Sequence, residues 1–287
     1  MAAEPLSLGT TRVGDGSFVW GTRTYVMGVV NVTPDSFSGD GIGEDVDAAV
    51  RQALRFQEWG ADIIDVGGES TRPGSIYEGA GPTSEQDELG RTVPVVEALA
   101  AELSIPVSID TYKARVAEAA VAVGAQMIND TWGFTRDPEM RHVAAGAGVP
   151  VVLMHNQDHT DYDDLVPNVI DGLRALAETA VDAGVDFENI VLDPGMGFGK
   201  TADHNLEILR RLAEFRTLNR PLLVGMSRKS TIGYVLDLPV DDRVEGTAAT
   251  VALSIANGAD IVRVHDVKEM ARVARMSDAV VRGWSHG

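Results

Sequence analysis

The sequence predicts an α/β protein, a (β/α)₈ TIM barrel preceded by a short N-terminal β-hairpin. The first observation behind this prediction is a series of eight short runs rich in apolar and β-branched residues. Parallel strands that are covered on both faces need such nearly continuous apolar sequences. The runs lie at 25–31, 62–67, 106–110, 126–130, 150–155, 189–193, 221–227 and 260–266.

Stretches with helical periodicity connect these runs and are the second observation. Apolar residues in 169–181 recur at the three- and four-residue spacing of an amphipathic helix, and 116–123 shows the same pattern. Glycines follow several helical stretches, at the place where a left-handed residue commonly ends a helix. They are Gly60, Gly124, Gly184 and Gly258.

The third observation is a motif that recurs in register, as "GADIID" at 60–65, "GAQMIN" at 124–129 and "GADIVR" at 258–263. Each copy joins a helix-ending glycine to a predicted strand and carries a polar residue at its sixth position. These polar residues are Asp65, Asn129 and Arg263. Strands that alternate regularly with helices favour a barrel, and an open doubly wound sheet is the alternative architecture.

Residues 1–24 have no helical period, and the "GDG" turn at 14–16 predicts a β-hairpin. We expect this hairpin to cap the N-terminal mouth of the barrel. No linker or low-complexity stretch divides the chain, so residues 1–287 are predicted to form a single domain. The polar, glycine-bearing stretch 74–88 is predicted to be a long loop, and such loops are usually functional or disordered.

The composition excludes several classes of protein. With no cysteine in 287 residues, the chain has neither a disulfide framework nor a thiolate nucleophile or metal ligand. A formal charge of −19 opposes sequence-independent binding of nucleic acid, which needs clustered basic residues. Neither a signal peptide nor a run of about 18 apolar residues occurs, so we expect a soluble, cytoplasmic protein without a membrane span.

Every predicted strand ends in polar side chains, and the carboxyl ends of all strands in a barrel meet on one face. The residues are Asn31, Asp65, Asp110, Asn129, Asp130, His155, Asp193, Ser227, Arg228, Lys229, Arg263, His265 and Asp266. Taken singly, Asp110 could cap a helix and Asp193 could form a turn. Their convergence favours a ligand site, because neighbouring buried carboxylates and amides are costly without polar partners.

A set of cationic residues after the predicted strands suits a phosphate or pyrophosphate group. The set consists of Arg72, Arg228, Lys229, Arg263 and His265. A helix is expected to begin near Ser230, where free backbone N–H groups attract anions. The glycine-rich "GMGFGKT" at 195–201 is not a Walker loop, because Pro194 occupies the position of the first glycine in that motif.

Two long motifs, "VMGVVNVTPDSFSGDG" at 26–41 and "DVGGESTRPG" at 65–74, are followed by "SIDT", "INDTWG", "LMHN", "LDPGMGFGK", "VGMSRKS" and "RVHDVKE". In content and order they resemble the dihydropteroate synthase family. The resemblance implies an enzyme that joins 6-hydroxymethyl-7,8-dihydropterin pyrophosphate to 4-aminobenzoate, giving 7,8-dihydropteroate and pyrophosphate for folate biosynthesis. It also implies Mg²⁺ as the cofactor and a homodimer.

The resemblance assigns roles to individual positions. It implies that the pterin contacts Asp110, Asn129, Met154, Asp193, Phe198 and Lys229. It implies that the pyrophosphate contacts Asn31, Arg72, Arg263 and His265, with Asn31 as the protein ligand of Mg²⁺. The 4-aminobenzoate is expected to contact Phe37, Thr71, Pro73 and Ser230. The implied catalytic residues are Asp110, Lys229, Asn31 and Arg263.

Two other functions remain open. Methyltetrahydrofolate:corrinoid methyltransferases share a pterin-binding barrel, although "STRPG" and "SRKS" favour a pyrophosphate leaving group and a carboxylated aniline. A barrel that binds pterins without catalysis is the other alternative, and the complete cationic set argues against it. The stretch 74–88 is longer than its counterpart in the family, so its outer half is assigned no role.

Overall fold

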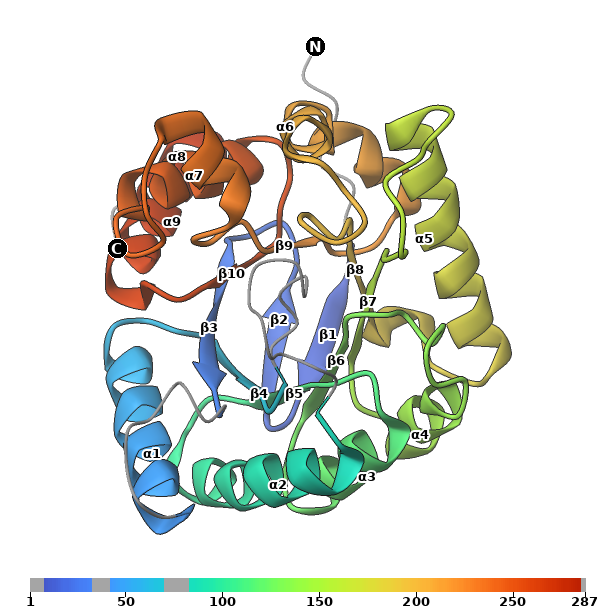
Figure 1. Ribbon diagram of the computed structural model, residues 1–287, viewed down its shortest axis with the longest axis vertical. Coiled ribbons are helices and arrows are strands. Elements are labelled where there is room, and N and C mark those ends of the chain that lie inside the picture. Colours follow the sequence, from blue (N-terminus) through green and yellow to red (C-terminus); the bar gives the residue numbers. More distant parts are fainter. Residues whose placement is uncertain (1–7, 33–41, 70–82, 285–287) are drawn as a thin grey trace.

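The computed structural model describes residues 8–32, 42–69 and 83–284, and within them parallel strands form a barrel that helices surround (Figure 1). Eight strands lie in the spatial order β8-β7-β6-β5-β4-β3-β10-β9. A parallel bridge between Leu192 in β8 and Leu222, just before β9, closes the sheet. The predicted barrel is therefore confirmed, and the alternative of an open doubly wound sheet is wrong.

Each predicted apolar run contains a strand of the barrel. The strands are β3 (Tyr25–Asn31), β4 (Ile63–Gly67), β5 (Val107–Asp110), β6 (Met127–Asp130), β7 (Val151–Met154), β8 (Ile190–Asp193), β9 (Leu223–Val224) and β10 (Ile261–Val264). The helices are α1 (Ile42–Glu58), α2 (Glu85–Glu102), α3 (Ala114–Ala122), α4 (Met140–Ala147), α5 (Leu165–Asp182), α6 (Ala202–Arg210), α7 (Ser230–Leu236), α8 (Val244–Ala256) and α9 (Val267–Val281), with 3₁₀ helices η1 (Phe187–Asn189) and η2 (Leu212–Leu218).

The strand predicted at 221–227 is much shorter in the structure. The backbone N–H of Lys229 donates to the carbonyl oxygen of Met226 at 3.2 Å, and Arg228 adopts a left-handed backbone with φ of 56°. The chain therefore turns immediately after β9, because a residue with this backbone conformation does not continue a strand. The turn delivers Lys229 and Ser230 directly to the start of α7.

Apolar side chains fill the layer between strands and helices. In α5, for example, Val169, Leu173 and Ala180 are fully buried, as the amphipathic pattern predicts. The four glycines predicted to end helices have φ of 99°, 119°, 101° and 102°, so these positive-φ helix ends are confirmed. Within the described ranges, no helix has both the length and the hydropathy that crossing a membrane requires.

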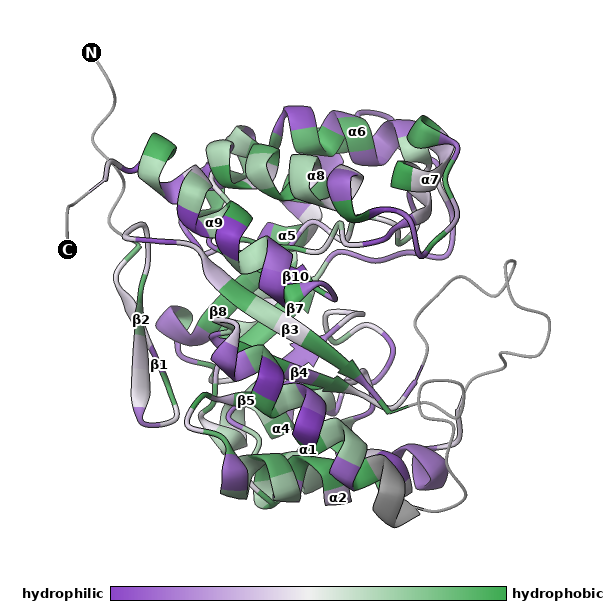
Figure 2. Ribbon diagram, turned by 90° about the vertical axis from the view of Figure 1, so that its left-hand side faces the viewer, coloured by the Kyte–Doolittle hydropathy of each residue, from purple (hydrophilic) through white to green (hydrophobic). Residues whose placement is uncertain are grey.

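The N-terminal hairpin covers the mouth of the barrel at the amino ends of its strands. Strands β1 (Thr10–Val13) and β2 (Gly16–Val19) pair antiparallel, and Figure 2 shows them at the end of β3 opposite its arrowhead. The ring of Phe18 stacks on Tyr25 with centroids 4.3 Å apart, and Trp20 meets Tyr25 edge-on at 5.4 Å. The predicted N-terminal β-hairpin is therefore confirmed.

Beneath the hairpin lies an apolar layer that we call the barrel floor. Its residues are Tyr25, Met27, Ile63, Met127, Val152, Val191, Leu223 and Ile261. They pack with Val13, Phe18 and Trp20 in one buried cluster. The floor and the hairpin together exclude water from the lower half of the barrel, so polar groups above them lie in a medium of low dielectric constant.

Trp20→Ala is predicted to lower the free energy of unfolding by about 3–5 kcal/mol, because it leaves a cavity under the floor and removes the 2.8 Å hydrogen bond from Nε1 to Thr11 Oγ1. Urea denaturation measures the loss. Val19→Ala on the same hairpin removes an exposed side chain and should change stability by less than about 0.5 kcal/mol. Equal unfolding midpoints for the two variants would contradict the structural role of the cap.

Candidate active site

The strand register brings the predicted site residues to one rim of the barrel. At the carboxyl ends of the strands, Asn31 pairs with Gly67, and Gly67 pairs with Asp110. Asp110 pairs in turn with Asn129. Side chains alternate between the two faces of a strand, so residues two positions apart share the barrel interior. The polar rim and the apolar floor are therefore successive layers of the same interior.

A buried charge network crosses the barrel at this rim. Arg263 of β10 donates from Nε to Asp65 Oδ2 at 2.6 Å and from Nη2 to Asp110 Oδ2 at 2.6 Å. Asn129 Nδ2 donates to the same oxygen of Asp65 at 3.0 Å. The polar residues from the three copies of the repeated motif thus meet in one cluster, which we call the Asp65–Arg263 network. It comprises Asp65, Asp110, Asn129 and Arg263.

Burial alters the acid–base behaviour of this network. It raises the pKa of Asp110 to about 7, although Arg263 opposes the rise. Burial alone would lower the pKa of Arg263, but Asp65 and Asp110 raise it, so the guanidinium stays charged. Oδ1 of Asp65 and Oδ1 of Asp110 are buried and have no hydrogen-bond partner among the described residues. Such acceptors are costly unless a bound molecule donates to them.

Asp193 and Lys229 add a second carboxylate and an ammonium group to the rim. Asp193 Oδ1 accepts a hydrogen bond from the backbone N–H of Gly195 at 2.7 Å. Burial raises the pKa of Asp193 while Lys229 opposes the rise, and burial lowers the pKa of Lys229 to about 8. Lys229 Nζ donates to the carbonyl oxygen of Met196 and lies 4.6 Å from the centre of the Phe198 ring.

The remaining predicted contacts in the described chain also lie at this end of the barrel. Met154 is buried and pairs in register with Asp193. A Cβ at Gly67 would lie 3.8 Å from Asn31 Oδ1 and 3.5 Å from Asp110 Oδ2. Asn31 therefore presents its amide oxygen on the same side of β4 as Asp110.

His265 and Ser230 follow the last two strands of the barrel. The backbone N–H of His265 donates to Ser227 Oγ at 3.1 Å, and its Nδ1 lies 3.0 Å from the same oxygen. Ser230 is half-buried and is the first residue of α7, as the sequence predicts. The expected contacts Phe37, Thr71, Arg72 and Pro73 lie outside the described residues.

Arg228, which the sequence places in the cationic set, has a different partner. Its Nε donates to Asp266 Oδ2 at 2.9 Å, and its Nη2 donates to Asp266 Oδ1. This bidentate salt bridge compensates the charge of Arg228 at the junction between β10 and α9. The side chain thus ties the turn after β9 to the start of α9.

Sequence reasoning missed the role of Lys200, which is almost fully buried. Its Nζ donates to the carbonyl oxygens of Phe198 and His155 at 2.9 and 3.2 Å and lies 3.1 Å from His155 Nδ1. Burial lowers the pKa of Lys200 to about 7 and that of His155 to about 3. Lys200 therefore holds the backbone beside Phe198. The feature of the sequence that could have indicated this role is the position of the lysine within the glycine-rich stretch 195–201.

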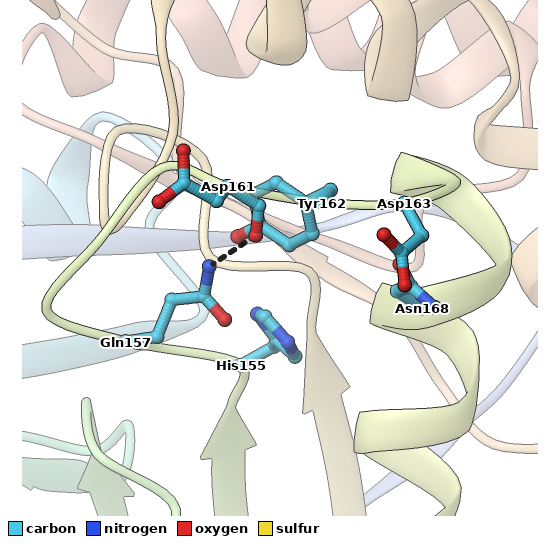
Figure 3. Close-up of a pocket in the computed structure, with 6 residues that line it drawn as sticks. All are labelled: His155, Gln157, Asp161, Tyr162, Asp163 and Asn168. Atoms are coloured by element: carbon cyan, nitrogen blue, oxygen red, sulfur yellow. Dashed lines mark hydrogen bonds between the residues drawn. The ribbon is translucent and has the colours of Figure 1, made fainter.

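A separate hollow of about 300 Å³ opens beside the connection between β7 and α5. Its lining consists of His155, Gln157, Asp161, Tyr162, Asp163 and Asn168, and Figure 3 shows the amide of Gln157 directed at the backbone of Asp161. The Asp65–Arg263 network contributes none of these six residues. The rim, with its unpartnered buried acceptors, is therefore the better candidate for the substrate site.

Comparison with known proteins decides the family. A family model described as a pterin binding enzyme matches residues 27–265. Dihydropteroate synthase of Clostridium beijerinckii is 51% identical over 94% of this chain and 99% of its own. The chain belongs to the dihydropteroate synthase family.

Solved structures of dihydropteroate synthases support this assignment. A Clostridium difficile enzyme crystallised in the presence of pteroic acid has a TM-score of 0.88 and 50% identity, covering 92% of this chain and 99% of its own. A Xanthomonas albilineans enzyme with 4-aminobenzoic acid has a TM-score of 0.88 and 41% identity, covering 94% of this chain and 97% of its own. The dihydropteroate synthase fold thus extends over nearly the whole chain.

Asp110→Asn is predicted to remove part of the pH dependence of stability. The folded protein raises the pKa of Asp110 to about 7 from 3.8, so it binds this proton more tightly than the unfolded chain does. The resulting stability is complete below about pH 4 and is lost as the pH rises to about 7. Relative to the wild type, Asp110→Asn should therefore gain stability across this range.

Urea denaturation at a series of pH values measures this difference. Asp186→Asn is the matched control, because it removes an exposed carboxyl group that lies outside the Asp65–Arg263 network. A constant difference between Asp110→Asn and the wild type over this range would show that burial does not perturb its carboxyl group.

Proposed function

We propose that the protein is a dihydropteroate synthase that joins 6-hydroxymethyl-7,8-dihydropterin pyrophosphate to 4-aminobenzoate. The carbon–oxygen bond to pyrophosphate breaks, a carbon–nitrogen bond to the aniline forms, and the aniline nitrogen loses a proton. The products are 7,8-dihydropteroate and pyrophosphate. The observation that carries this proposal is the meeting of buried carboxylate, amide and ammonium groups in the Asp65–Arg263 network and beside it, at one rim.

The rim suits a planar heterocycle that has both donors and acceptors at its edge. Asp110, Asn129 and Asp193 supply a carboxylate, an amide and a second carboxylate, and Lys229 supplies an ammonium donor. Oδ1 of Asp110 is buried without a partner in the described chain, so a ring N–H would satisfy it. We propose that these four residues bind the pterin, with Met154 and Phe198 against its faces.

The charges at the rim suit a reaction in which the leaving group departs first. Departure of pyrophosphate with the bonding electrons leaves a positive methylene carbon attached to the pterin. The carboxylate of Asp110 stabilises that cation electrostatically, because it lies in a site of low dielectric constant. The pKa of Asp110, about 7 in the free protein, falls when a positive charge forms nearby. Formation of the methylene cation therefore favours the charged form of this carboxylate.

We propose that Arg263 serves the pterin as well as the pyrophosphate. Its guanidinium is shared between Asp65 and Asp110, so these carboxylates largely compensate its charge before any substrate binds. A pyrophosphate group therefore needs further positive charge. We propose that Arg72 and His265 supply it together with Arg263, and that Mg²⁺ would add to it when bound.

Asn31 is the protein group that we propose as a ligand of Mg²⁺. Among the described residues, no group of three or more histidine, aspartate or glutamate side chains could hold a metal ion. Mg²⁺ often takes few protein ligands where substrate phosphates and water complete its shell, so the amide oxygen of Asn31, on the same side of β4 as Asp110, is a suitable single ligand. When bound, the ion would compensate negative charge that develops on the departing pyrophosphate.

The second substrate is expected to approach from the segments that precede α1 and follow β4. Phe37, Thr71 and Pro73 remain proposed contacts of 4-aminobenzoate, together with Ser230 at the start of α7. The amino group of this substrate attacks the methylene cation, so water must be excluded until it has bound. The lack of cysteine suits a reducing cytoplasm, which is the compartment we propose for the reaction.

We also propose a homodimer, because apolar side chains are exposed on α7, α8 and α9. These three helices lie next to one another (Figure 1). The side chains are Tyr234, Val235, Leu236, Leu253, Met276 and Val280. Covering them between two copies would remove this surface from water. Analytical ultracentrifugation should give a mass of two chains at micromolar concentration, and a single-chain mass would contradict the proposal.

Pyrophosphate release tests the proposed reaction directly. The protein is incubated with the pterin pyrophosphate and Mg²⁺, with or without 4-aminobenzoate, and 7,8-dihydropteroate is measured in parallel. We expect both products only when 4-aminobenzoate is present. A methyltransferase acting on a corrinoid, or a pterin-binding protein without activity, would release no pyrophosphate in either mixture.

Arg263→Lys should lower kcat/KM by roughly thirtyfold, or about 2 kcal/mol, because lysine keeps the charge but cannot bridge Asp65 and Asp110 with a planar fork. The affinity for a pterin without pyrophosphate should fall as well, since Arg263 orients Asp110. Isothermal titration calorimetry and steady-state kinetics measure the two effects. Unchanged pterin affinity would show that Arg263 serves the pyrophosphate alone.

A further inference from the structure

Lys113, which lies just before α3, joins three segments of the chain. Its Nζ donates to Glu69 Oε2 at 2.5 Å, to the carbonyl oxygen of Thr83 at 2.9 Å, and to Glu88 Oε2. A lysine ammonium has three N–H donors, and here each has its own acceptor. The side chain is therefore held in one orientation by partners from the end of β4, the residue before the N-cap of α2, and α2 itself.

The positions of these partners relate Lys113 to the proposed site. Glu69 and Thr83 are the described residues on either side of 70–82, the segment that contains the expected contacts Thr71 and Arg72. Lys113 follows Asp110 by three residues, beyond the end of β5. One ammonium group thus connects both ends of the segment 70–82 to the strand that carries the central carboxylate of the site.

The surroundings make these contacts strong. The side chain of Glu88 is 1% exposed, and those of Lys113 and Glu69 are 13% and 15% exposed. Burial alone would lower the pKa of Lys113, but hydrogen bonds to Glu69 and Glu88 raise it above its ordinary value. The ammonium therefore stays charged, and its salt bridges are poorly screened by water or salt.

Gly68 brings the end of β4 close to α2 and supports the same arrangement. A Cβ at residue 68 would lie 2.5 Å from Thr92 Cγ2 and 3.0 Å from Glu88 Cγ, so α2 leaves no space for a side chain here. The carbonyl oxygen of Gly68 also accepts a hydrogen bond from Arg91 Nη1 at 3.2 Å. The end of β4 is thus fixed against the helix that carries Glu88.

We propose that Lys113 is a positioning residue that holds the two ends of the segment 70–82 in register with Asp110. The inference rests on the proposed function, in which residues of this segment contact the aminobenzoate and pyrophosphate. Lys113 itself touches neither substrate. The hydrogen bonds of Lys113 to Glu69 and to the backbone of Thr83 fix these two residues relative to β5, so they keep a set position relative to a substrate held by Asp110.

A purely structural role is the competing explanation, since Lys113 also neutralises the buried Glu88. Removing the lysine leaves that buried carboxylate without a hydrogen-bond partner in the described parts of the chain, and this alone costs stability. Glu69→Gln separates the two roles, because it weakens the connection to the end of β4 while Lys113, Thr83 and Glu88 remain together. Both variants are therefore needed.

The test compares the Michaelis constant for aminobenzoate with the affinity for a bare pterin. We expect this Michaelis constant to rise roughly tenfold in Lys113→Met and roughly fivefold in Glu69→Gln, as loss of one charge-assisted contact permits. The dissociation constant of a pterin without pyrophosphate, measured by calorimetry, should change by less than about twofold, since Asp110, Asn129 and Asp193 remain in place. Lys113→Arg should restore part of the loss.

Arg115→Met is the matched control. Arg115 Nη1 binds Glu85 Oε1 at 3.0 Å and joins the same two helices, but its side chain is 71% exposed and touches neither end of the segment 70–82. This variant should match the wild type in every measurement. If Glu69→Gln also matches the wild type, or if Lys113→Met weakens pterin and aminobenzoate equally, the positioning role is wrong.

Hydrogen exchange separates failure of this inference from failure of the proposed reaction. Amide exchange in the free protein needs no substrate, and Lys113→Met and Glu69→Gln should both accelerate exchange at the backbone N–H groups of Gly68, Glu69, Thr83 and Ser84 relative to Arg115→Met. A wild type that releases no pyrophosphate would overturn the proposed function. Unaltered exchange in both variants would overturn the role of Lys113, whatever the activity.

Discussion

The salt bridge between Asp65 and Arg263 is the interaction on which the rest of the site depends. Asp65 is fully buried inside the barrel, and an unpaired carboxylate there would be strongly destabilising. Arg263 reaches it from β10, which is not its neighbour in the sheet, and also binds Asp110 on β5. The bonds therefore cross the interior instead of running along the sheet. They orient the carboxylate of Asp110, and its other oxygen is left for a ligand.

The layers of the barrel interior explain why these charges are perturbed. The N-terminal hairpin and the apolar floor exclude water from below, and the surrounding helices exclude it from the sides. In such a setting burial raises the pKa of Asp110 and Asp193 and lowers that of Lys229. The stabilising cap and the reactive rim are thus two ends of one structure, because without the dry floor the rim groups would ionise as they do in water.

Cationic side chains near the rim divide into two kinds. Arg263 and Lys229 lie among the carboxylates that we assign to the pterin, whereas Lys113, Lys200 and Arg228 hold backbone carbonyls or carboxylates of the surrounding loops. Each of the latter three is bound to groups of the protein itself, which uses its charge to fix a turn. Rigid turns matter here because the residues of a barrel rim come from segments distant in sequence, and small shifts of any segment would separate them.

The sequence by itself determined the barrel, its strand positions, the hairpin and the motifs that identify the family, because periodicity and local motifs are properties of short segments. The motif that recurs three times in the sequence also indicated that Asp65, Asn129 and Arg263 occupy equivalent positions at the ends of their strands. Only the tertiary structure decided that these three side chains form hydrogen bonds with one another. It also decided that Arg228 forms a salt bridge with Asp266, and that Lys113 and Lys200 bind groups of the surrounding loops. The physical reason is that the partner of a charge is set by distances between strands and loops far apart in the chain, and a linear pattern does not contain those distances.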